Sequence, residues 1–215
     1  IMALDTQKTI GFLKIIGALK DLERFRGQFF WREYPQRDRY ESVADHTWRM
    51  AMMLILVEPH LSEPIDLGKA LKMLLIHDLP EIIAGDLSPL GSDGTGQDSH
   101  LYNKEKAEEK YQNEKKAAES IFGNLPKEQA EEFLALWLEF EEQENYESRV
   151  VKAIDKIEGK LQASEYLQGH MFPAHLDFSL KYGVSTFEVD PTLKELGMAI
   201  NEELKKDYKE FKTGG

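Results

Sequence analysis

The sequence predicts an all-α protein. Apolar residues recur every three or four positions through most of the 215 residues, which is the period of a helix buried on one face. Strand-like alternation of apolar and polar residues is scarce. Capping residues, glycines and prolines separate the periodic segments from one another. With 41% hydrophobic and 31% charged residues, the chain has the composition of an ordinary globular protein.

Two helices are expected near the amino terminus. The first begins at a capping residue, Asp5 or Thr6, and the second ends at Pro59, because proline cannot continue a helix. The stretch between them mixes aromatic and basic residues with Gly27 and Pro35, which favours a loop. The expected ranges are 6–20 and 42–57 for the helices and 24–40 for the loop.

A third helix is expected over residues 67–83, with Asp66 as its cap. Pro80 lies inside this range and lacks a backbone N–H, so we expect it to kink the helix. Residues 87–103 follow, and they hold several Gly, Ser and Asp residues. They predict a flexible loop, and loops of this length are often functional.

Amphipathic segments fill the carboxyl-terminal half. Gly123 ends the first of them, and Pro126 lies in the first turn of the next. Residues 169–189 combine Gly, Pro and aromatic residues and are expected to be irregular, whereas Asp190 and Pro191 open a last helix. The expected helical ranges are 104–122, 126–144, 148–167 and 190–211.

Composition excludes several kinds of function. The chain has no cysteine, so any metal must be bound by His, Asp and Glu. A net charge of −12 argues against a surface that binds a nucleic-acid polymer, although a local cation can still attract a small anion. No apolar run is long enough to span a membrane and no signal-peptide pattern is present, so we expect a cytoplasmic protein with no membrane partner.

His77 and Asp78 are the first candidates for chemistry. The residues before them, 71–76, are apolar almost all round, which predicts a buried helix. A carboxylate buried in such a helix needs a compensating charge, and a metal cation would supply it. The alternative is a packed histidine beside a capping aspartate.

Three further residues could complete a site. His46 borders the apolar stripe of its helix, Glu81 shares a face with His77 and Asp78, and Asp86 follows Gly85 in a turn that could present an anion-binding backbone. Each also has a plainer interpretation, respectively a core histidine, a solvated glutamate and a helix C-cap.

Asp155 borders the apolar stripe of its helix. An acid at such a position is commonly an ion-pair partner, here of Lys152 or Lys156, and the alternative role is that of a metal ligand.

Taken together, these segments resemble the HD-domain superfamily of metal-dependent phosphohydrolases, in its 5′-deoxynucleotidase-like branch. The resemblance covers about Leu19 to Tyr166. It rests on Glu41-Ser-Val-Ala-Asp-His46, on Ile76-His-Asp-Leu-Pro-Glu81 with Gly85-Asp86, and on Asp155-Lys-Ile-Glu158.

The resemblance implies a helical bundle, usually dimeric, that forms one HD-type domain over residues 1–215 with its core at about 19–168. It also implies one divalent ion, which could be Mn²⁺, Co²⁺, Fe²⁺, Ni²⁺, Zn²⁺ or Mg²⁺. Glu81 would orient or deprotonate the attacking water. The implied metal ligands are His46, His77, Asp78 and Asp155, and the implied substrate loop is Asp86, Leu87, Ser88 and Pro89.

The chain departs from its relatives at the residues expected to bind phosphate and sugar. Relatives carry an Arg-Trp pair upstream of the first histidine, and this sequence has none. Arg24-Phe25 matches best by distance from the first helix, while Trp31-Arg32 is an inverted candidate nearer to His46. The departure leaves the preference for deoxy sugars open.

The resemblance implies hydrolysis of (deoxy)nucleoside 5′-monophosphates to a nucleoside and phosphate, with Asp86 as a second catalytic group. The open alternatives are an HD phosphohydrolase acting on another nucleotide or phosphoester, a non-catalytic nucleotide-binding or scaffold protein, and a helical bundle without a site. His60, His100, His170 and His175 receive no role.

Overall fold

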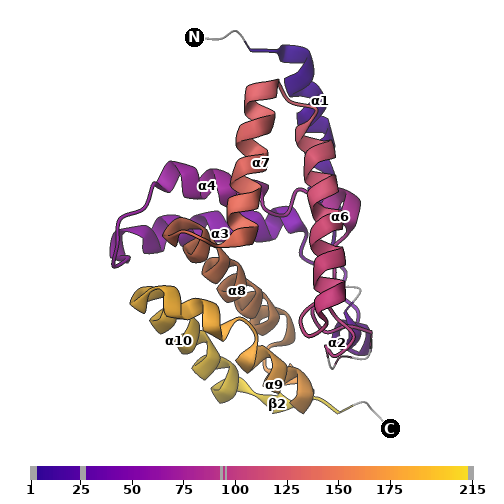
Figure 1. Ribbon diagram of the computed structural model, residues 1–215. Helices are drawn as coiled ribbons and strands as arrows, with labels where there is room; N and C mark the ends of the chain where they lie inside the picture. Colours follow the sequence, from indigo (N-terminus) through magenta and orange to yellow (C-terminus); the bar gives the residue numbers. More distant parts are fainter. Residues whose placement is uncertain (1–3, 25–27, 93, 95, 213–215) are drawn as a thin grey trace. The chain divides into compact units, whose positions relative to one another are not determined.

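Helices form nearly all of the regular structure in the computed structural model, which describes residues 4–24, 28–92, 94 and 96–212 (Figure 1). The expected all-α fold is confirmed. In the described residues the sheet is a single parallel pair of two-residue strands, β1 (His170–Met171) and β2 (Lys209–Glu210). No helix among these residues is both long enough and apolar enough to cross a membrane.

The chain divides into two compact units, Ile1–Thr47 with Leu75–Leu138, and Trp48–Leu74 with Glu139–Gly215. Three helices cross the boundaries between these segments and so contribute residues to both units. They are α3 (Val43–Val57), α4 (Leu67–Ile76) and α7 (Lys127–Glu142).

The first unit is built around α1 and α6, which lie side by side (Figure 1). The ring of Phe133, in α7, meets the edges of Phe12 and Phe122 at centroid distances of 6.0 and 5.8 Å. Trp137 is almost fully buried and stacks on Tyr111. The remaining elements are α1 (Thr6–Ile16), η1 (Gly17–Lys20), α2 (Phe29–Glu33), α5 (Glu81–Ala84) and α6 (Lys104–Phe122).

The second unit packs α8 against α10 and η3. One face of α8 is fully buried, and it carries Val150, Ile154 and Ile157. Gly197 lets α10 approach η3 closely, because a Cβ there would lie 2.5 Å from the ring of Phe187. Its elements are η2 (Glu58–His60), α8 (Tyr146–Leu167), α9 (Pro173–Lys181), η3 (Val184–Val189) and α10 (Pro191–Asp207), with both strands.

Two segments that we expected to be irregular contain helices. The predicted loop 24–40 includes α2, whose Phe30 and Trp31 are buried, and the predicted irregular stretch 169–189 includes α9, whose His175 is buried. Neither helix has a side-chain cap, although α9 begins at a proline, and burial of one face stabilises both. The last helix also ends earlier than expected, at Asp207.

Local capping signals were interpreted correctly. Asp5 caps α1 by accepting from the backbone N–H of Lys8, and Asp66 caps α4 by accepting from that of Lys69.

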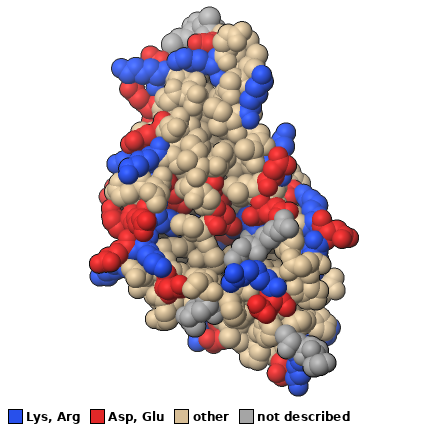
Figure 2. Space-filling view, turned by 90° about the vertical axis from the view of Figure 1, so that its right-hand side faces the viewer, with Lys and Arg blue, Asp and Glu red and all other residues tan. Residues whose placement is uncertain are grey.

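The long loop 87–103 has neither helix nor strand among its described residues. On the face shown in Figure 2, Lys and Arg side chains are interspersed with Asp and Glu.

Asp190 connects the start of α10 to two other parts of the second unit. Its carboxylate accepts hydrogen bonds from the backbone and hydroxyl of Ser62, from the hydroxyl of Tyr146 and from the backbone of Thr192. Burial acts to raise the pKa of Asp190, but these hydrogen bonds outweigh it and lower the pKa to about 2. The ionised carboxylate therefore stabilises the fold.

We expect Asp190→Asn to lower the free energy of unfolding by about 2 kcal/mol at neutral pH, since the pKa falls from 3.8 to about 2 on folding. The contribution is complete above about pH 4 and is lost as the pH falls towards 2. Denaturant unfolding of wild type and variant at pH 7 and at pH 3 would measure it. A deficit in the variant that stays constant, or grows, on acidification would contradict the role of the charge.

Candidate metal centre

A capping box fixes the start of α3 and with it the position of His46. The carboxylate of Asp45 accepts hydrogen bonds from the backbone and hydroxyl of Ser42, and the Ser42 hydroxyl accepts one from the backbone of Asp45. The backbone N–H of His46 donates to the Ser42 carbonyl, which starts the helical ladder. His46 has no exposed surface, so the helix presents its imidazole to the interior.

His77 and Asp78 lie in a turn and not inside a helix, which corrects our expectation of one kinked helix over 67–83. Helix α4 ends at Ile76, and α5 begins only at Glu81. The backbone of Leu79 donates to Ile76 and that of Glu81 donates to Asp78, so the turn is closed by i→i+3 bonds. Pro80 has no N–H to give to Ile76 and disfavours helical geometry at Leu79, which explains a break instead of a kink.

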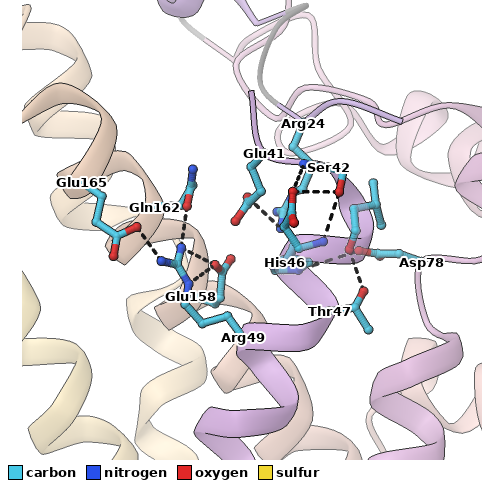
Figure 3. A network of polar contacts seen from close by, with 12 residues as sticks. Arg24, Glu41, Ser42, His46, Thr47, Arg49, Asp78, Glu158, Gln162 and Glu165 are labelled. Atoms are coloured by element: carbon cyan, nitrogen blue, oxygen red, sulfur yellow. Dashed lines mark hydrogen bonds and ion pairs between the residues drawn. The ribbon is translucent and has the colours of Figure 1, made fainter. Parts of the chain in front are cut away.

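In the first unit the turn brings His46 and His77 to the carboxylate of Asp78; Figure 3 shows His46 and Asp78. His46 Nε2 lies 3.7 Å from Asp78 Oδ2, and His77 Nε2 lies 3.1 Å from Asp78 Oδ1. The two imidazole centroids are 5.9 Å apart. The indole of Trp137 donates to the carbonyl of His77 at 3.1 Å and holds the turn in place. The structure thus brings together three of the ligands that the sequence predicted.

This donor set fits a divalent ion. Two atoms that each bind one ion at ~2.1 Å lie ~3 Å apart at a right angle and at most ~4.2 Å apart. The distances of 3.1 and 3.7 Å between the nitrogens and the carboxylate oxygens fall within these limits. Imidazole nitrogen and carboxylate oxygen suit several first-row divalent ions, so the donors do not select one metal.

Glu81 and Asp86 add negative charge beside this cluster. Burial raises the pKa of Glu81 well above its usual value, and the charges of Asp78 and Asp86 raise it further. The cations Arg24 and Lys110 act in the opposite direction but do not cancel the shift. Glu81 therefore lies within electrostatic range of both aspartates.

Gly85 precedes the predicted substrate loop, Asp86 to Pro89, and its φ of 80° is the left-handed conformation that glycine adopts easily. Helix α5 ends before Gly85, and Asp86 follows it. The side chain of Leu87 is exposed. The hydroxyl of Ser88 accepts a hydrogen bond from the backbone of Leu90 and so shapes the turn at Pro89.

Arg24 and Trp31 have different surroundings in the first unit. The backbone of Arg24 donates to the Glu41 carbonyl at 2.8 Å, and its guanidinium lies 3.7 Å from the buried Glu41 carboxylate. Trp31 is 3% exposed and packs edge-on against Tyr34, while Arg32 donates to the carbonyl of Ser92. Phe25, the expected neighbour of Arg24, lies outside the described residues.

Asp155, the fourth expected ligand, belongs to α8 in the second unit and is 8% exposed. Its Oδ2 lies 2.9 Å from Lys156 Nζ, so the ion pair that we considered for it is present with Lys156. Lys152 pairs with Glu141 instead.

Sequence reasoning missed two features around these residues. Lys110, on α6, affects the charge at Glu81, but no spacing in the sequence connects it to α5. Arg49 follows His46 by one helical turn, and in the second unit its guanidinium hydrogen bonds to Glu158, Gln162 and Glu165 of α8 (Figure 3). Glu158 is fully buried, and an acid at a buried position of a predicted helix is the signal that could have indicated a basic partner.

Comparison with known proteins places the chain in a family. A family model described as an HD domain matches residues 19–197. A 5′-deoxynucleotidase of Dictyostelium discoideum is 39% identical over 160 residues, which cover 72% of this chain and 75% of that protein. A 5′-deoxynucleotidase of Xenopus laevis is 33% identical over 192 residues, covering 89% and 85%.

A solved structure agrees with these matches. It is a protein of Magnetospirillum magnetotacticum named "predicted metal-dependent phosphohydrolase", with 28% sequence identity and a TM-score of 0.71, and the match covers 94% of this chain and 95% of that one. The resemblance that the motifs indicated is therefore confirmed. The chain belongs to the HD-domain family of metal-dependent phosphohydrolases, in its 5′-deoxynucleotidase-like branch.

Proposed function

We propose that this protein hydrolyses nucleoside 5′-monophosphates to a nucleoside and inorganic phosphate, using one divalent ion. The observation that carries the proposal is the convergence of His46 and His77 on the carboxylate of Asp78, with Glu81 beside it. The names of the relatives, 5′-deoxynucleotidases, support a nucleotide as the substrate class.

The proposed metal ligands are His46, His77, Asp78 and Asp155. The first three stand together in the first unit, and the family motif supports Asp155 as the fourth. In this proposal both units act as one HD-type domain. The ion, when bound, polarises a water and shields the charge of the phosphoryl group.

Side chains around the cluster would transfer the protons and bind the substrate. Glu81, which lies within electrostatic range of Asp78 and Asp86, accepts the proton of the attacking water. Asp86 gives a proton to the departing sugar oxygen or holds a sugar hydroxyl. Arg24, oriented by Glu41, holds the phosphate as a forked donor.

We propose only a weak preference for deoxy sugars. Trp31, the tryptophan nearest to the expected position, is buried against Tyr34, so it does not offer its ring to a sugar. Leu87 follows Asp86 in the proposed substrate loop and is 47% exposed, so its side chain is available to contact a nucleoside.

We further propose that the protein is a cytoplasmic homodimer. Helix α3 exposes Trp48 and Leu56, each 67% accessible, with Met52 on the same side. A second copy would cover this apolar surface. Light scattering of the purified protein, which should give twice the chain mass, tests the dimer.

A phosphate-release screen tests the proposed activity. Nucleoside 5′-monophosphates, in ribo and deoxy forms, would be compared with triphosphates and cyclic nucleotides, each with Mn²⁺, Co²⁺, Mg²⁺ and Zn²⁺. Release from the monophosphates supports the proposal. If no monophosphate is hydrolysed with any of these metals and another class of nucleotide is cleaved, that class is the substrate and the proposal is wrong.

Glu81→Gln and Asp78→Asn should separate proton transfer from metal binding. Glu81→Gln keeps the size and hydrogen-bonding reach of the side chain but removes its basic oxygen, so turnover should fall by about 10²–10⁴-fold with metal content unchanged. Asp78→Asn replaces a carboxylate ligand by a neutral amide and should lose metal and turnover together. Steady-state kinetics with metal analysis measures both, and near-wild-type turnover in Glu81→Gln would remove the base role from Glu81.

Removing the metal should also destabilise the protein. Without the ion, the charges of Asp78, Glu81 and Asp86 repel one another in a partly buried site. A ligand at 100–1,000 times its dissociation constant contributes about 3–4 kcal/mol. Thermal melts with and without EDTA would show the difference, and Asp78→Asn serves as a control that EDTA should leave unchanged. Coincident melts of the wild-type protein would argue against this contribution.

A further inference from the structure

In the second unit, Lys156 contacts a proposed metal ligand directly. Its Nζ lies 2.9 Å from Oδ2 of Asp155, and the two side chains are 20% and 11% exposed. Neighbouring residues on a helix point about 100° apart, so such a pair forms only when the longer side chain bends back towards the shorter one. Something must therefore hold the lysine stem in this direction.

Gly183 and Tyr182, at the end of α9, provide that support. A Cβ on Gly183 would lie 2.6 Å from Cβ and 2.8 Å from Cγ of Lys156, so only glycine leaves room for the stem. The φ of Gly183 is 73°, which also favours glycine. The ammonium lies 5.1 Å from the ring centroid of Tyr182, and that ring stacks on Phe178. The lysine thus lies between a rigid ring and a glycine that no larger residue replaces without strain.

We propose that Lys156 is a positioning residue that holds Oδ2 of Asp155 and so makes Asp155 a one-oxygen ligand through Oδ1. The inference rests on the proposed metal site. A carboxylate can bind an ion through one oxygen or through both. With Lys156 on Oδ2, Asp155 occupies one coordination position, and the position that its second oxygen would take stays open for water or substrate.

The proposal predicts that replacing Lys156 by a neutral residue increases the affinity for the metal ion. Loss of Lys156 removes a positive charge close to the ion and lets Asp155 bind through both oxygens, and both effects tighten metal binding. A unit charge one carboxylate away from a divalent ion changes its affinity by about tenfold even at high dielectric. A purely structural role for Lys156 predicts the opposite, namely weaker metal binding in a less stable protein.

The test compares Lys156→Met with Lys152→Met as a matched control. Both lysines lie on α8, both side chains are 20% exposed, and both pair with a carboxylate beside an aromatic ring. Lys152 pairs with Glu141 and not with Asp155. Titration of the metal-free full-length proteins with Co²⁺, followed by visible absorption, gives both the dissociation constant and the coordination of the ion.

For Lys156→Met we expect the dissociation constant for Co²⁺ to fall by about tenfold, the Co²⁺ absorption to weaken as coordination number rises, and kcat to fall by about 10–100-fold. Lys156→Arg, which keeps the charge and the donor, should restore wild-type affinity, and Lys152→Met should behave as wild type. An equal or larger dissociation constant in Lys156→Met, or an unchanged kcat, would overturn the proposal.

Gly183→Ala provides a second test if Lys156→Met folds poorly in thermal melts. It keeps the lysine charge but displaces the stem, so Co²⁺ should again bind more tightly, by less than in Lys156→Met. Unchanged or weaker Co²⁺ binding in a folded Gly183→Ala protein would overturn the proposal. Wild-type protein that binds Co²⁺ but hydrolyses no nucleotide would contradict the proposed function, whereas the comparison of Co²⁺ affinities would still decide the role of Lys156.

Discussion

The cost of placing carboxylates in surroundings poor in water governs how the polar residues of this protein are arranged. A buried charge is tolerated only when another charge or several hydrogen bonds compensate it. In the second unit, protein cations and donors do this. Arg49 compensates the fully buried Glu158, Lys156 compensates Asp155, and hydroxyl and backbone donors compensate Asp190. In the first unit, burial and the charges of Asp78 and Asp86 raise the pKa of Glu81 in spite of Arg24 and Lys110. The divalent ion that we propose would supply a compensating positive charge.

One proline makes the cluster possible. Helix α4 carries an apolar run up to Ile76, and a continued helix would point His77 and Asp78 in directions about 100° apart. Because the helix breaks before Pro80, the carboxylate of Asp78 turns back so that each of its oxygens meets one imidazole. Glu81 then starts a new helix beside them. His77 and Asp78 thus depend on a backbone feature that lies two to three residues further along the chain.

The sequence predicted those parts that depend on neighbouring residues. The caps at Asp5 and Asp66, the helix 104–122 and the motif residues could be recognised because their signals lie within a few positions of one another. Helices α2 and α9 could not, because aromatic residues, glycines and prolines surround them and burial of residues such as Trp31 and His175 holds them. The break at Pro80 was taken for a kink, since its i→i+3 bonds cannot be read from spacing. For the same reason Lys110 and Arg49 were missed, because their partners lie on other helices.

The central claim is that one divalent ion is bound by His46, His77, Asp78 and Asp155. An anomalous difference map from a crystal of the full-length protein grown with Co²⁺, measured at the cobalt edge, tests it most directly. We predict a single peak per chain, roughly 2.0–2.3 Å from Nε2 of both histidines and from one oxygen of each aspartate. A peak bound by other residues, or a cobalt ion at His77 and Asp78 that Asp155 does not reach, would contradict the claim.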